Sequence, residues 1–330
     1  MIADGLQKLM LGESLSEAEA RELFRAFLSE DVSPLQKAAA LGALAAKRPT
    51  ADELVGFVTE MREHMVAVPV EGDVVLDTCG TGGGPPSFNL STGAAFVAAA
   101  AGVHVAKHGN RAVSSKCGSA DVLEALGANL ELDVPNLQRV FRETGMQFLF
   151  APNQHPAMRV MGPIRREIGV RTVFNWLGPL ANPARANVQL IGHFSREALP
   201  IMAEAAARLG VQRGAIVHAE GGMDEVSPVG VTSLVLLNGE LLTLAPRDFG
   251  IGEVDLSPGE TVAESADVLR LALSGRDPRR SDALIPSVAV GLWLAGRAGS
   301  IAEGAELARE TLRSGAAERK LNQFVEATRS

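Results

Sequence analysis

The chain has 330 residues, of which 46% are hydrophobic and 4% aromatic, and a formal net charge of −8. This composition supplies a sizeable apolar core and argues against a disordered chain. The negative charge disfavours a nucleic-acid partner, because neutralising phosphates requires clustered Lys and Arg. No apolar run is long enough to span a bilayer, and the N-terminus lacks the basic and apolar blocks of a signal peptide, so we expect no membrane partner.

The first 70 residues predict helices only. Ser16 and Thr50 each stand three residues before a glutamate, which is the spacing of a capping box. Ser33 precedes a proline that suits the first position of a helix. Apolar residues then recur at helical spacing. This part of the chain carries no recognisable catalytic pattern.

From residue 74 the pattern changes to short β-branched runs that alternate with helical segments. This alternation indicates a mostly parallel sheet with crossover helices. Asn238-Gly239 lies between two apolar runs and predicts a β-hairpin, and helices return from about residue 265. The predicted class is α/β. A small N-terminal all-helical domain (residues 1–70) precedes a large α/β domain (71–330) with a mostly parallel central sheet and C-terminal helices.

The first candidate binding site is the segment DTCGTGGGPPSFNLST, residues 77–92, between a predicted strand and a predicted helix. Glycines allow backbone amides to approach a phosphate because no Cβ stands in the way. Ser91 and Thr92 can cap the helix and offer hydroxyls to an anion at its positive end. The segment matches neither the P-loop nor the dinucleotide-binding pattern. A surface turn without a ligand is the alternative.

The second candidate site, KHGNRAVSSKCGS at residues 107–119, also follows a strand and precedes a helix, with Ser119 as a plausible cap. Its three cations, three serines and two glycines suit a second anion. The alternative is a solvated basic loop. Loops at the carboxyl ends of neighbouring strands open onto one crevice in α/β sheets, which favours the binding site. His108 and His155 could each contact a substrate or support a loop.

The third candidate site is GGMDEVS at residues 221–227, directly after a predicted strand. Adjacent carboxylates such as Asp224 and Glu225 suit Mg²⁺, which takes one or two protein carboxylates and fills its other positions with water and phosphate oxygens. The alternative is a solvated acidic turn. A phosphorylated sugar that carries a pyrophosphate would satisfy all three sites together.

Two cysteines, Cys79 and Cys117, lie in the glycine- and serine-rich loops. They form no disulfide framework, so we expect a cytoplasmic protein. The two side chains could be a redox pair or small buried thiols, and the sequence does not decide between these.

Four motifs give the chain a resemblance to the anthranilate phosphoribosyltransferase family over nearly its whole length: GTGG, KHGNR…SS followed by GS-x-D, R-x-x-x-G-x-RT-x-FN-x-LGPL-x-NP, and GG-x-DEVS. The resemblance implies a homodimer formed through the helical domain, with part of residues 165–185 packed on that domain. It implies transfer of phosphoribose from 5-phosphoribosyl 1-pyrophosphate (PRPP) to the amino group of anthranilate, an early step of tryptophan biosynthesis. An amidotransferase subunit of anthranilate synthase is a further candidate partner.

The resemblance also implies roles for individual residues. The PRPP-binding set would be Gly80, Gly83, Gly84, Ser87, Asn89, Leu90, Ser91, Thr92, Lys107, His108, Gly109, Asn110, Arg111, Ala112, Val113, Ser114, Ser115 and Ser119. The anthranilate-binding set would be Gly80, Asn110, His155 and Arg165. Two Mg²⁺ ions would bind, one to Ser91 and one to Asp224 and Glu225. His108 is a candidate catalytic residue, but the aromatic amine is neutral near pH 7, so no general base is obligatory.

One position departs from the family, which usually has Asp after the double glycine where this chain has Gly84. We expect this change to lessen repulsion between the loop and pyrophosphate and to alter the response to Mg²⁺. Two other functions are considered. A pyrimidine nucleoside phosphorylase shares the architecture but needs neither Arg165 nor the Asp224-Glu225 pair. A non-catalytic nucleic-acid binder on the same fold would need a basic groove.

Overall fold

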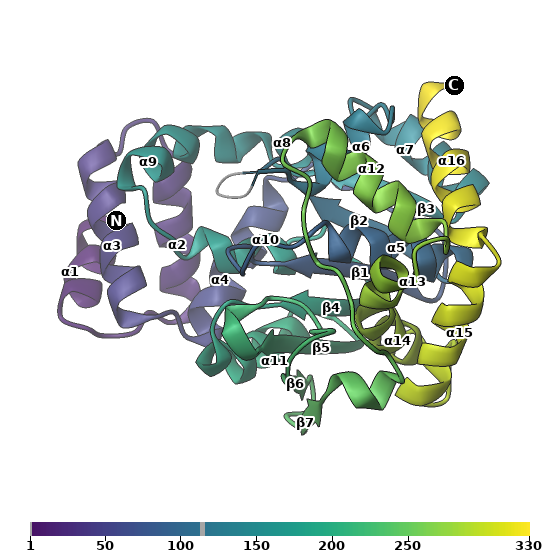
Figure 1. The fold of residues 1–330 in the computed structure, drawn as a ribbon. Helices are drawn as coiled ribbons and strands as arrows, with labels where there is room; N and C mark the ends of the chain where they lie inside the picture. Colours follow the sequence, from purple (N-terminus) through teal and green to yellow (C-terminus); the bar gives the residue numbers. More distant parts are fainter. Residues whose placement is uncertain (1, 113–115) are drawn as a thin grey trace.

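The computed structural model describes residues 2–112 and 116–330. They form a helical bundle beside a larger domain built on a sheet, as Figure 1 shows. The helices of the bundle are α1 (Ile2–Met10), α2 (Glu17–Leu28), α3 (Pro34–Lys47) and α4 (Ala51–Glu63). Ser16 and Thr50 form the predicted capping boxes, and Pro34 is the first residue of α3. Local capping therefore sets where these helices begin.

The described residues form a seven-stranded sheet in the order β3-β2-β1-β4-β5-β6-β7. The strands are β1 (Val75–Gly80), β2 (His104–Gly109), β3 (Met146–Phe150), β4 (Val188–Gly192), β5 (Arg213–Ala219), β6 (Thr232–Leu236) and β7 (Leu241–Leu244). The first five are parallel, and β6 and β7 are antiparallel. The predicted α/β class with a mostly parallel sheet is thus confirmed, and Asn238-Gly239 lies in the turn of the β6–β7 hairpin.

Helices cover the sheet and continue to the C-terminus. They are α5 (Leu90–Ala100), α6 (Ser119–Ala125), α7 (Val134–Thr144), α8 (Ala151–Gln154), α9 (Met161–Ile168), α10 (Phe174–Leu180), α11 (Leu199–Arg208), α12 (Val262–Leu273), α13 (Pro278–Ser281), α14 (Ile285–Leu294), α15 (Ile301–Arg313) and α16 (Ala316–Arg329). Short 3₁₀ turns are η1 (Pro156–Val160), η2 (Arg196–Ala198), η3 (Glu220–Gly222), η4 (Pro246–Phe249) and η5 (Asp282–Leu284). None of the helices described is long and apolar enough to cross a membrane.

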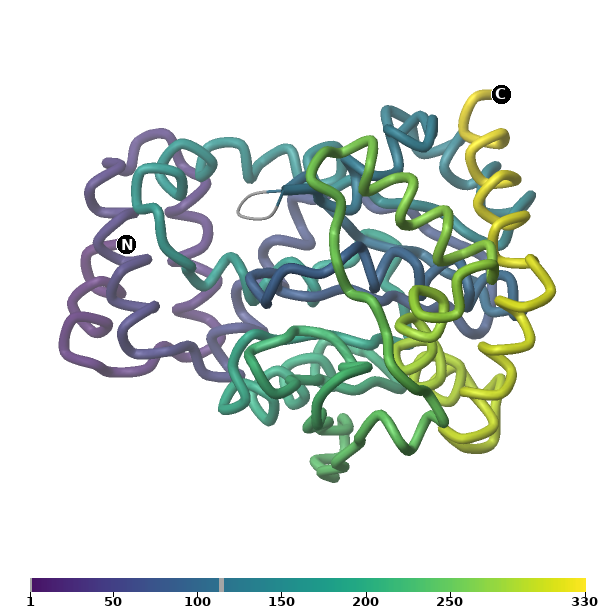
Figure 2. The backbone as a smooth tube through the Cα atoms, viewed as in Figure 1, coloured from purple at the N-terminus to yellow at the C-terminus, as the bar shows by residue number. Residues whose placement is uncertain are grey.

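The segment from α8 to α10 leaves the sheet domain, runs along the helical bundle and returns, as the tube in Figure 2 shows. Phe174 of this segment lies 6.0 Å from the rings of both Phe24 and Phe27 of α2, centroid to centroid. Trp176 and Leu177 belong to the same buried cluster as these rings. The bundle therefore shares its core with α10, so this segment connects the two domains by apolar packing.

Candidate functional site

The candidate site lies at the carboxyl ends of β1, β2 and β5, where the three predicted motifs follow their strands. In Figure 1 the carboxyl ends of β1 and β2 point toward the helical bundle. Strand β4 lies between β1 and β5, and its last residue, Gly192, is the register partner of Gly80 on β1. The sheet thus brings the glycine-rich loop and the acidic loop to one edge.

Asp224 crosses this edge in very close contact with both strands. A Cβ on Gly192 would lie 1.6 Å from the Asp224 carbonyl oxygen, and a Cβ on Gly80 would lie 2.5 Å from Asp224 Oδ2. The amide of Gly82 donates to the same Oδ2 at 2.6 Å. The glycine-rich loop therefore already binds an anion, which is a carboxylate of the protein itself.

The acid pair Asp224 and Glu225 is half-buried, and the positive charge around it does not fully compensate its own. Burial, and next the charge of Asp224, raises the pKa of Glu225 to about 8. Burial also raises the pKa of Asp224, although the Gly82 amide and then Arg171 oppose the rise. Ser91 lies close enough to Glu225 to lower its pKa. This environment favours binding of a cation.

These residues fit Mg²⁺. Among the residues described, no group of three or more His, Cys, Asp and Glu side chains could hold a metal ion. Asp224 and Glu225 with the Ser91 hydroxyl supply only oxygen donors, and Mg²⁺ keeps several positions for water and phosphate. A divalent cation here would also neutralise the pair, whose raised pKa values indicate that its charge is disfavoured.

Lys107 lies beneath the glycine-rich loop and is buried. Its ammonium donates to the carbonyl of Thr78 and, at 3.3 Å, to Ser91 Oγ. The charge of Lys107 opposes the rise in pKa of both Asp77 and Glu225. The lysine thus contacts the end of β1 and the start of α5, and it balances buried carboxylates there.

The first turn of α5 differs from the expected capping. The helix begins at Leu90 with Asn89 as its N-cap, so Ser91 and Thr92 lie inside the helix and do not cap it. Leu90 and Thr92 are buried, whereas Ser87 is half-buried. The Leu90 amide donates to the Phe88 carbonyl at 2.6 Å, so it is not free for a ligand. Asn89 Nδ2 donates to the carbonyl of Cys117 at 3.2 Å and so connects the first motif to the second.

Arg111, the arginine of the second motif, does not face an open anion-binding loop. Arg111 makes a two-pronged ion pair with Glu124 and stacks over Phe150 with its Cζ 5.2 Å from the ring centroid. The carbonyl of Asn110 accepts from Ser119 Oγ at 3.2 Å. Gly118, rather than Ser119, is the N-cap of α6.

The rest of the second motif is held by an acid. Asp121 accepts from the amides of Ala112 and Gly118, each at 2.8 Å, and so fixes both ends of the loop. Gly109 ends β2, and a Cβ there would lie 2.4 Å from Ser119 Oγ. The predicted ligands Val113, Ser114 and Ser115 lie outside the described residues.

His108 and His155 are buried next to each other, with ring centroids 5.2 Å apart. Burial lowers the pKa of His108 to about 3 and that of His155 to about 4, so both rings are neutral at physiological pH. His108 Nδ1 lies 3.0 Å from the Gly178 carbonyl, which assigns the ring proton to Nδ1 and leaves Nε2 as an acceptor. Neither ring can therefore supply a positive charge to a substrate.

Arg165 on α9 is a half-buried cation. Its Cζ lies 5.2 Å over the ring of Phe174, and burial lowers its pKa. Among the described residues, the guanidinium has no carboxylate within ion-pair distance and no hydrogen-bond acceptor. Such a group is available to bind an external carboxylate, because leaving a partly buried charge unpaired is costly.

The two cysteines are not bridged. Burial raises the pKa of both Cys79 and Cys117, so each remains a protonated thiol near neutral pH. A protonated thiol is a poor nucleophile, and both side chains are half-buried.

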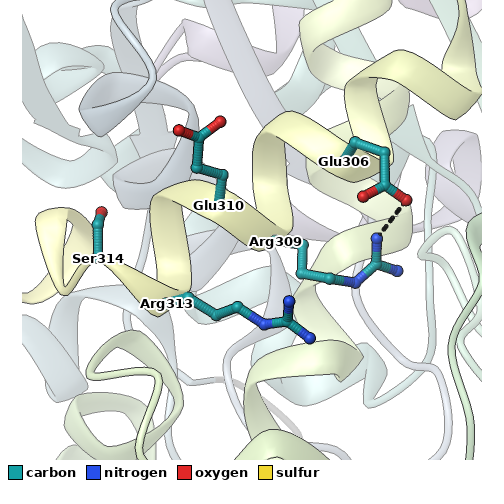
Figure 3. A pocket seen from close by; sticks show the side chains of 5 residues that line it. All are labelled: Glu306, Arg309, Glu310, Arg313 and Ser314. Atoms are coloured by element: carbon teal, nitrogen blue, oxygen red, sulfur yellow. Dashed lines mark hydrogen bonds and ion pairs between the residues drawn. The ribbon is translucent and has the colours of Figure 1, made fainter.

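A cavity of about 430 Å³ lies elsewhere, on α15, and Figure 3 shows the five side chains that line it. Some of the charged side chains that line it already have partners. Arg309 pairs with Glu306 at 2.6 Å and donates to the carbonyl of Phe249 at 2.8 Å. This cavity is not part of the candidate site.

Comparisons with known proteins agree with this arrangement. Residues 72–318 match the glycosyl transferase family, a/b domain, and residues 3–65 match its helical bundle domain. An anthranilate phosphoribosyltransferase of Pelotomaculum thermopropionicum is 44% identical over 99% of this chain and 97% of the relative. The chain belongs to the anthranilate phosphoribosyltransferase family. The resemblance found in the sequence is thus confirmed.

Solved structures of anthranilate phosphoribosyltransferases superpose closely on this chain. The enzyme of Thermus thermophilus has a TM-score of 0.93 and 43% identity, over 99% of this chain and 100% of that one. The enzyme of Saccharomyces cerevisiae, in complex with PRPP and Mg, has a TM-score of 0.91 and 28% identity, over 99% and 98% of the two chains. The yeast enzyme has also been solved in complex with 4-fluoroanthranilate.

Sequence reasoning missed three residues of the site. The carboxylate of Asp77, whose pKa burial raises to about 6, accepts from the His108 amide at 3.1 Å and from Asn182 Nδ2 at 2.8 Å. Asn182 also donates to the Ala106 carbonyl at 2.8 Å. Arg171 contacts the glycine-rich loop. Asn182 and Arg171 both lie in the quoted family motif, which was the available signal, but the sequence alone does not say what either contacts.

The crossing of Asp224 over β4 is testable with Gly192→Ala. The new Cβ would overlap the Asp224 carbonyl, so we expect the acidic loop to move, the melting temperature to fall by several degrees, and Mg²⁺ affinity by calorimetry to drop at least about tenfold. Gly252→Ala is the matched control, because a Cβ there meets nothing within 4 Å. Equal stability and equal Mg²⁺ affinity in the two variants would contradict the crossing.

Proposed function

We propose that this chain transfers the phosphoribosyl group of PRPP to the amino group of anthranilate, giving N-(5-phosphoribosyl)anthranilate and pyrophosphate, in the pathway to tryptophan. The observation that carries the proposal is the contact between the glycine-rich loop and Asp224. It joins an anion-binding loop to an acid pair at one strand edge. Family membership over the full chain supports the same reaction.

The glycine-rich loop is proposed to hold the pyrophosphate of the donor. The amide of Gly82 now donates to a carboxylate oxygen, and phosphate oxygens accept the same kind of hydrogen bond. Asn89 and the first turn of α5 add backbone donors at a helix N-terminus. Asn110, Ser119 and the adjoining loop would hold the phosphoribosyl side, where Asp121 fixes the amides of Ala112 and Gly118.

Asp224 and Glu225 would hold one Mg²⁺ and Ser91 a second, giving two ions per active site. When bound, Mg²⁺ neutralises the negative charge that develops on the leaving pyrophosphate. The yeast relative in complex with PRPP and Mg supports the requirement for this metal. Lys107, fixed under Ser91, keeps this hydroxyl next to the acid pair.

Arg165 would bind the carboxylate of anthranilate. Its planar guanidinium matches a carboxylate with two parallel hydrogen bonds, and no acid of the described chain competes for it. The neutral rings of His108 and His155 would border the aromatic ring of the substrate without repelling its amine. His108 Nε2 is buried and has no hydrogen-bond partner among the described residues.

The reaction follows from positioning and charge. As the bond between C1 and the pyrophosphate oxygen breaks, positive charge grows on the ribose and negative charge on the leaving group. The anthranilate nitrogen then bonds to C1 and releases one proton to solvent or to the departing pyrophosphate. Preorganised amides of the glycine-rich loop stabilise the leaving group, while Arg165 holds the amine near C1. The amine is already neutral near pH 7, so the enzyme needs no strong base.

The unpaired Arg165 also argues against a nucleoside phosphorylase activity, since a pyrimidine nucleoside carries no carboxylate that Arg165 could bind. A net charge of −8 opposes a nucleic-acid binder, which would need a basic groove. We place the activity in the cytoplasm, where unbridged cysteines are expected.

The test is anthranilate fluorescence over time with PRPP and Mg²⁺. We expect a decrease that requires all three components, and Arg165→Met should raise the KM for anthranilate at least about tenfold, since a charged hydrogen-bond pair is lost. Arg166→Met, an exposed neighbour on α9, is the control and should leave the KM unchanged. Phosphorolysis of thymidine or uridine by a protein that does not consume anthranilate would refute the proposal.

Gly84 should set the response to Mg²⁺. A Cβ at this position would lie 2.9 Å from Asp224 Oδ1, so Gly84→Asp places a third carboxylate beside the acid pair. We expect the added charge to tighten Mg²⁺ binding several-fold and to move the Mg²⁺ optimum of the activity to a lower concentration. Gly84→Asn has nearly the same volume without the charge. If both variants keep the wild-type Mg²⁺ profile, position 84 does not set the response to Mg²⁺.

We also propose a homodimer formed through the helical bundle. Met10 and Leu11 at the end of α1 and Leu35 on the adjoining α3 are exposed, Leu35 by 80%. Leu35→Glu should therefore convert the dimer to a monomer, as light scattering after size exclusion would show. The control is Leu241→Glu on the exposed edge strand β7, which should stay dimeric. A wild-type chain with the mass of one subunit would contradict the dimer.

A further inference from the structure

Arg171 is a cation at the glycine-rich loop to which none of the motifs assigns a role. It lies between α9, which ends at Ile168, and α10, which begins at Phe174. Its Nη1 donates to the carbonyl of Gly83 at 3.3 Å. A Cβ on Gly83 would lie 2.3 Å from this nitrogen, and the φ of Gly83 is +91°. Gly83 therefore suits this backbone conformation, and a Cβ there would force the Arg171 guanidinium to shift.

The guanidinium of Arg171 rests on an aromatic surface. Its Cζ lies 4.2 Å from the centroid of the Phe194 ring, within the range of a cation–π contact. Phe194 stacks on His193 with centroids 4.4 Å apart, and His193 in turn meets Trp176 edge-on at 4.4 Å. The amide of Phe194 donates to Thr81 Oγ1 at 3.2 Å. This surface is thus attached to the same loop that Arg171 contacts.

The charge of Arg171 is not neutralised. In the part of the chain that the structure describes, no carboxylate lies within ion-pair distance of it, and the Gly83 carbonyl is its one hydrogen-bond acceptor. The side chain is exposed, so its remaining N–H groups face solvent at the mouth of the loop. Its charge is nonetheless close enough to Asp224 to oppose the rise in the pKa of that acid. Arg171 therefore lies beside both partners of the candidate pyrophosphate site.

We propose that Arg171 is a positioning and binding residue for the pyrophosphate group of the donor. It fixes the glycine-rich loop through Gly83 and offers its free guanidinium N–H groups to a phosphate oxygen. The fork of an arginine suits phosphate, and stacking on Phe194 pre-orients the fork before the ligand arrives. Lys107 cannot take this role from the open side, because its ammonium is buried beneath the loop.

The placement of Arg171 also joins the two substrate sites. Arg165, the proposed ligand of the anthranilate carboxylate, lies on α9, and only Gly169 and Val170 separate Arg171 from the end of that helix. Arg171 contacts the loop of the donor, so one short segment touches both proposed subsites. This inference rests on the proposed function for the identity of the donor, but the contact with Gly83 and Phe194 does not.

The test compares Arg171→Gln with wild type, using inorganic pyrophosphate and Mg²⁺ as the probe. We expect calorimetry to show a Kd for pyrophosphate that is about 10- to 100-fold higher, as for loss of a charge-assisted hydrogen bond. The KM for PRPP should rise in parallel, while the KM for anthranilate changes less than about twofold. Arg166→Gln, an exposed arginine of α9, is the control. Arg171→Lys should restore only part of the affinity, because it keeps the charge and loses the fork.

A second measurement needs no variant. Phenylglyoxal modifies exposed arginines, and mass spectrometry can follow the peptide that carries Arg171. Pyrophosphate with Mg²⁺ should slow modification of Arg171 in the wild-type enzyme and leave Arg166 unaffected. Unchanged pyrophosphate affinity in Arg171→Gln, or no protection of Arg171, would overturn the proposal. An active wild type with either result refutes the role of Arg171 alone, whereas a wild type without turnover refutes the proposed function.

Discussion

The site depends on one close approach, in which Asp224 passes over the ends of two neighbouring strands. Gly80 and Gly192 are register partners in the parallel β1–β4 pair, and both must lack a Cβ for the acidic loop to lie where it does. This close approach places the acid pair beside the glycine-rich loop, and it gives the loop amides an anion to bind before any ligand is present.

In this arrangement the charged forms of several carboxylates at the site are electrostatically unfavourable. Burial disfavours the charged forms of Asp77, Asp224 and Glu225, whose pKa values are all raised. Lys107 and Arg171 compensate only in part. A stable fold tolerates such groups where a ligand later removes the penalty. The free energy of neutralising this acid pair is then available for binding a cation and, with it, an anionic donor.

Much of this architecture could be predicted from the sequence, for reasons that differ between elements. The capping boxes at Ser16 and Thr50 are local, so their helices begin where the pattern says. The order of strands and helices follows from hydrophobic periodicity. The start of α5 was misjudged, because Asn89 and not Ser91 or Thr92 is its N-cap. The loop geometry before that helix is set by tertiary contacts, such as the 3.0 Å hydrogen bond from the Phe88 amide to the Leu256 carbonyl.

The contacts that could not be predicted are those between segments far apart in the chain. No motif in the sequence marks Gly192, and only the path of residue 224 explains it. Asp77 looked like part of a phosphate loop, yet it binds Asn182 at a separation of 105 residues. The sequence predicts that Arg111 faces an anion, but in the structure Arg111 forms an ion pair with Glu124. A residue type suggests which ligand a side chain could bind. The fold determines whether the side chain already has a partner within the chain.

The segment from α8 to α10 brings distant parts of the chain together at the level of whole domains. It packs Phe174 into the core of the helical bundle, and it also carries Arg165 over that ring and Arg171 against the donor loop. None of the candidate-site residues described above lies on α1 to α4, but the bundle fixes the position of both arginines through this packing. A substitution in the core of the bundle that moves Phe174 should therefore affect substrate binding before it affects the sheet. The bundle thus contributes to the proposed site through the segment it packs against and not through ligands of its own.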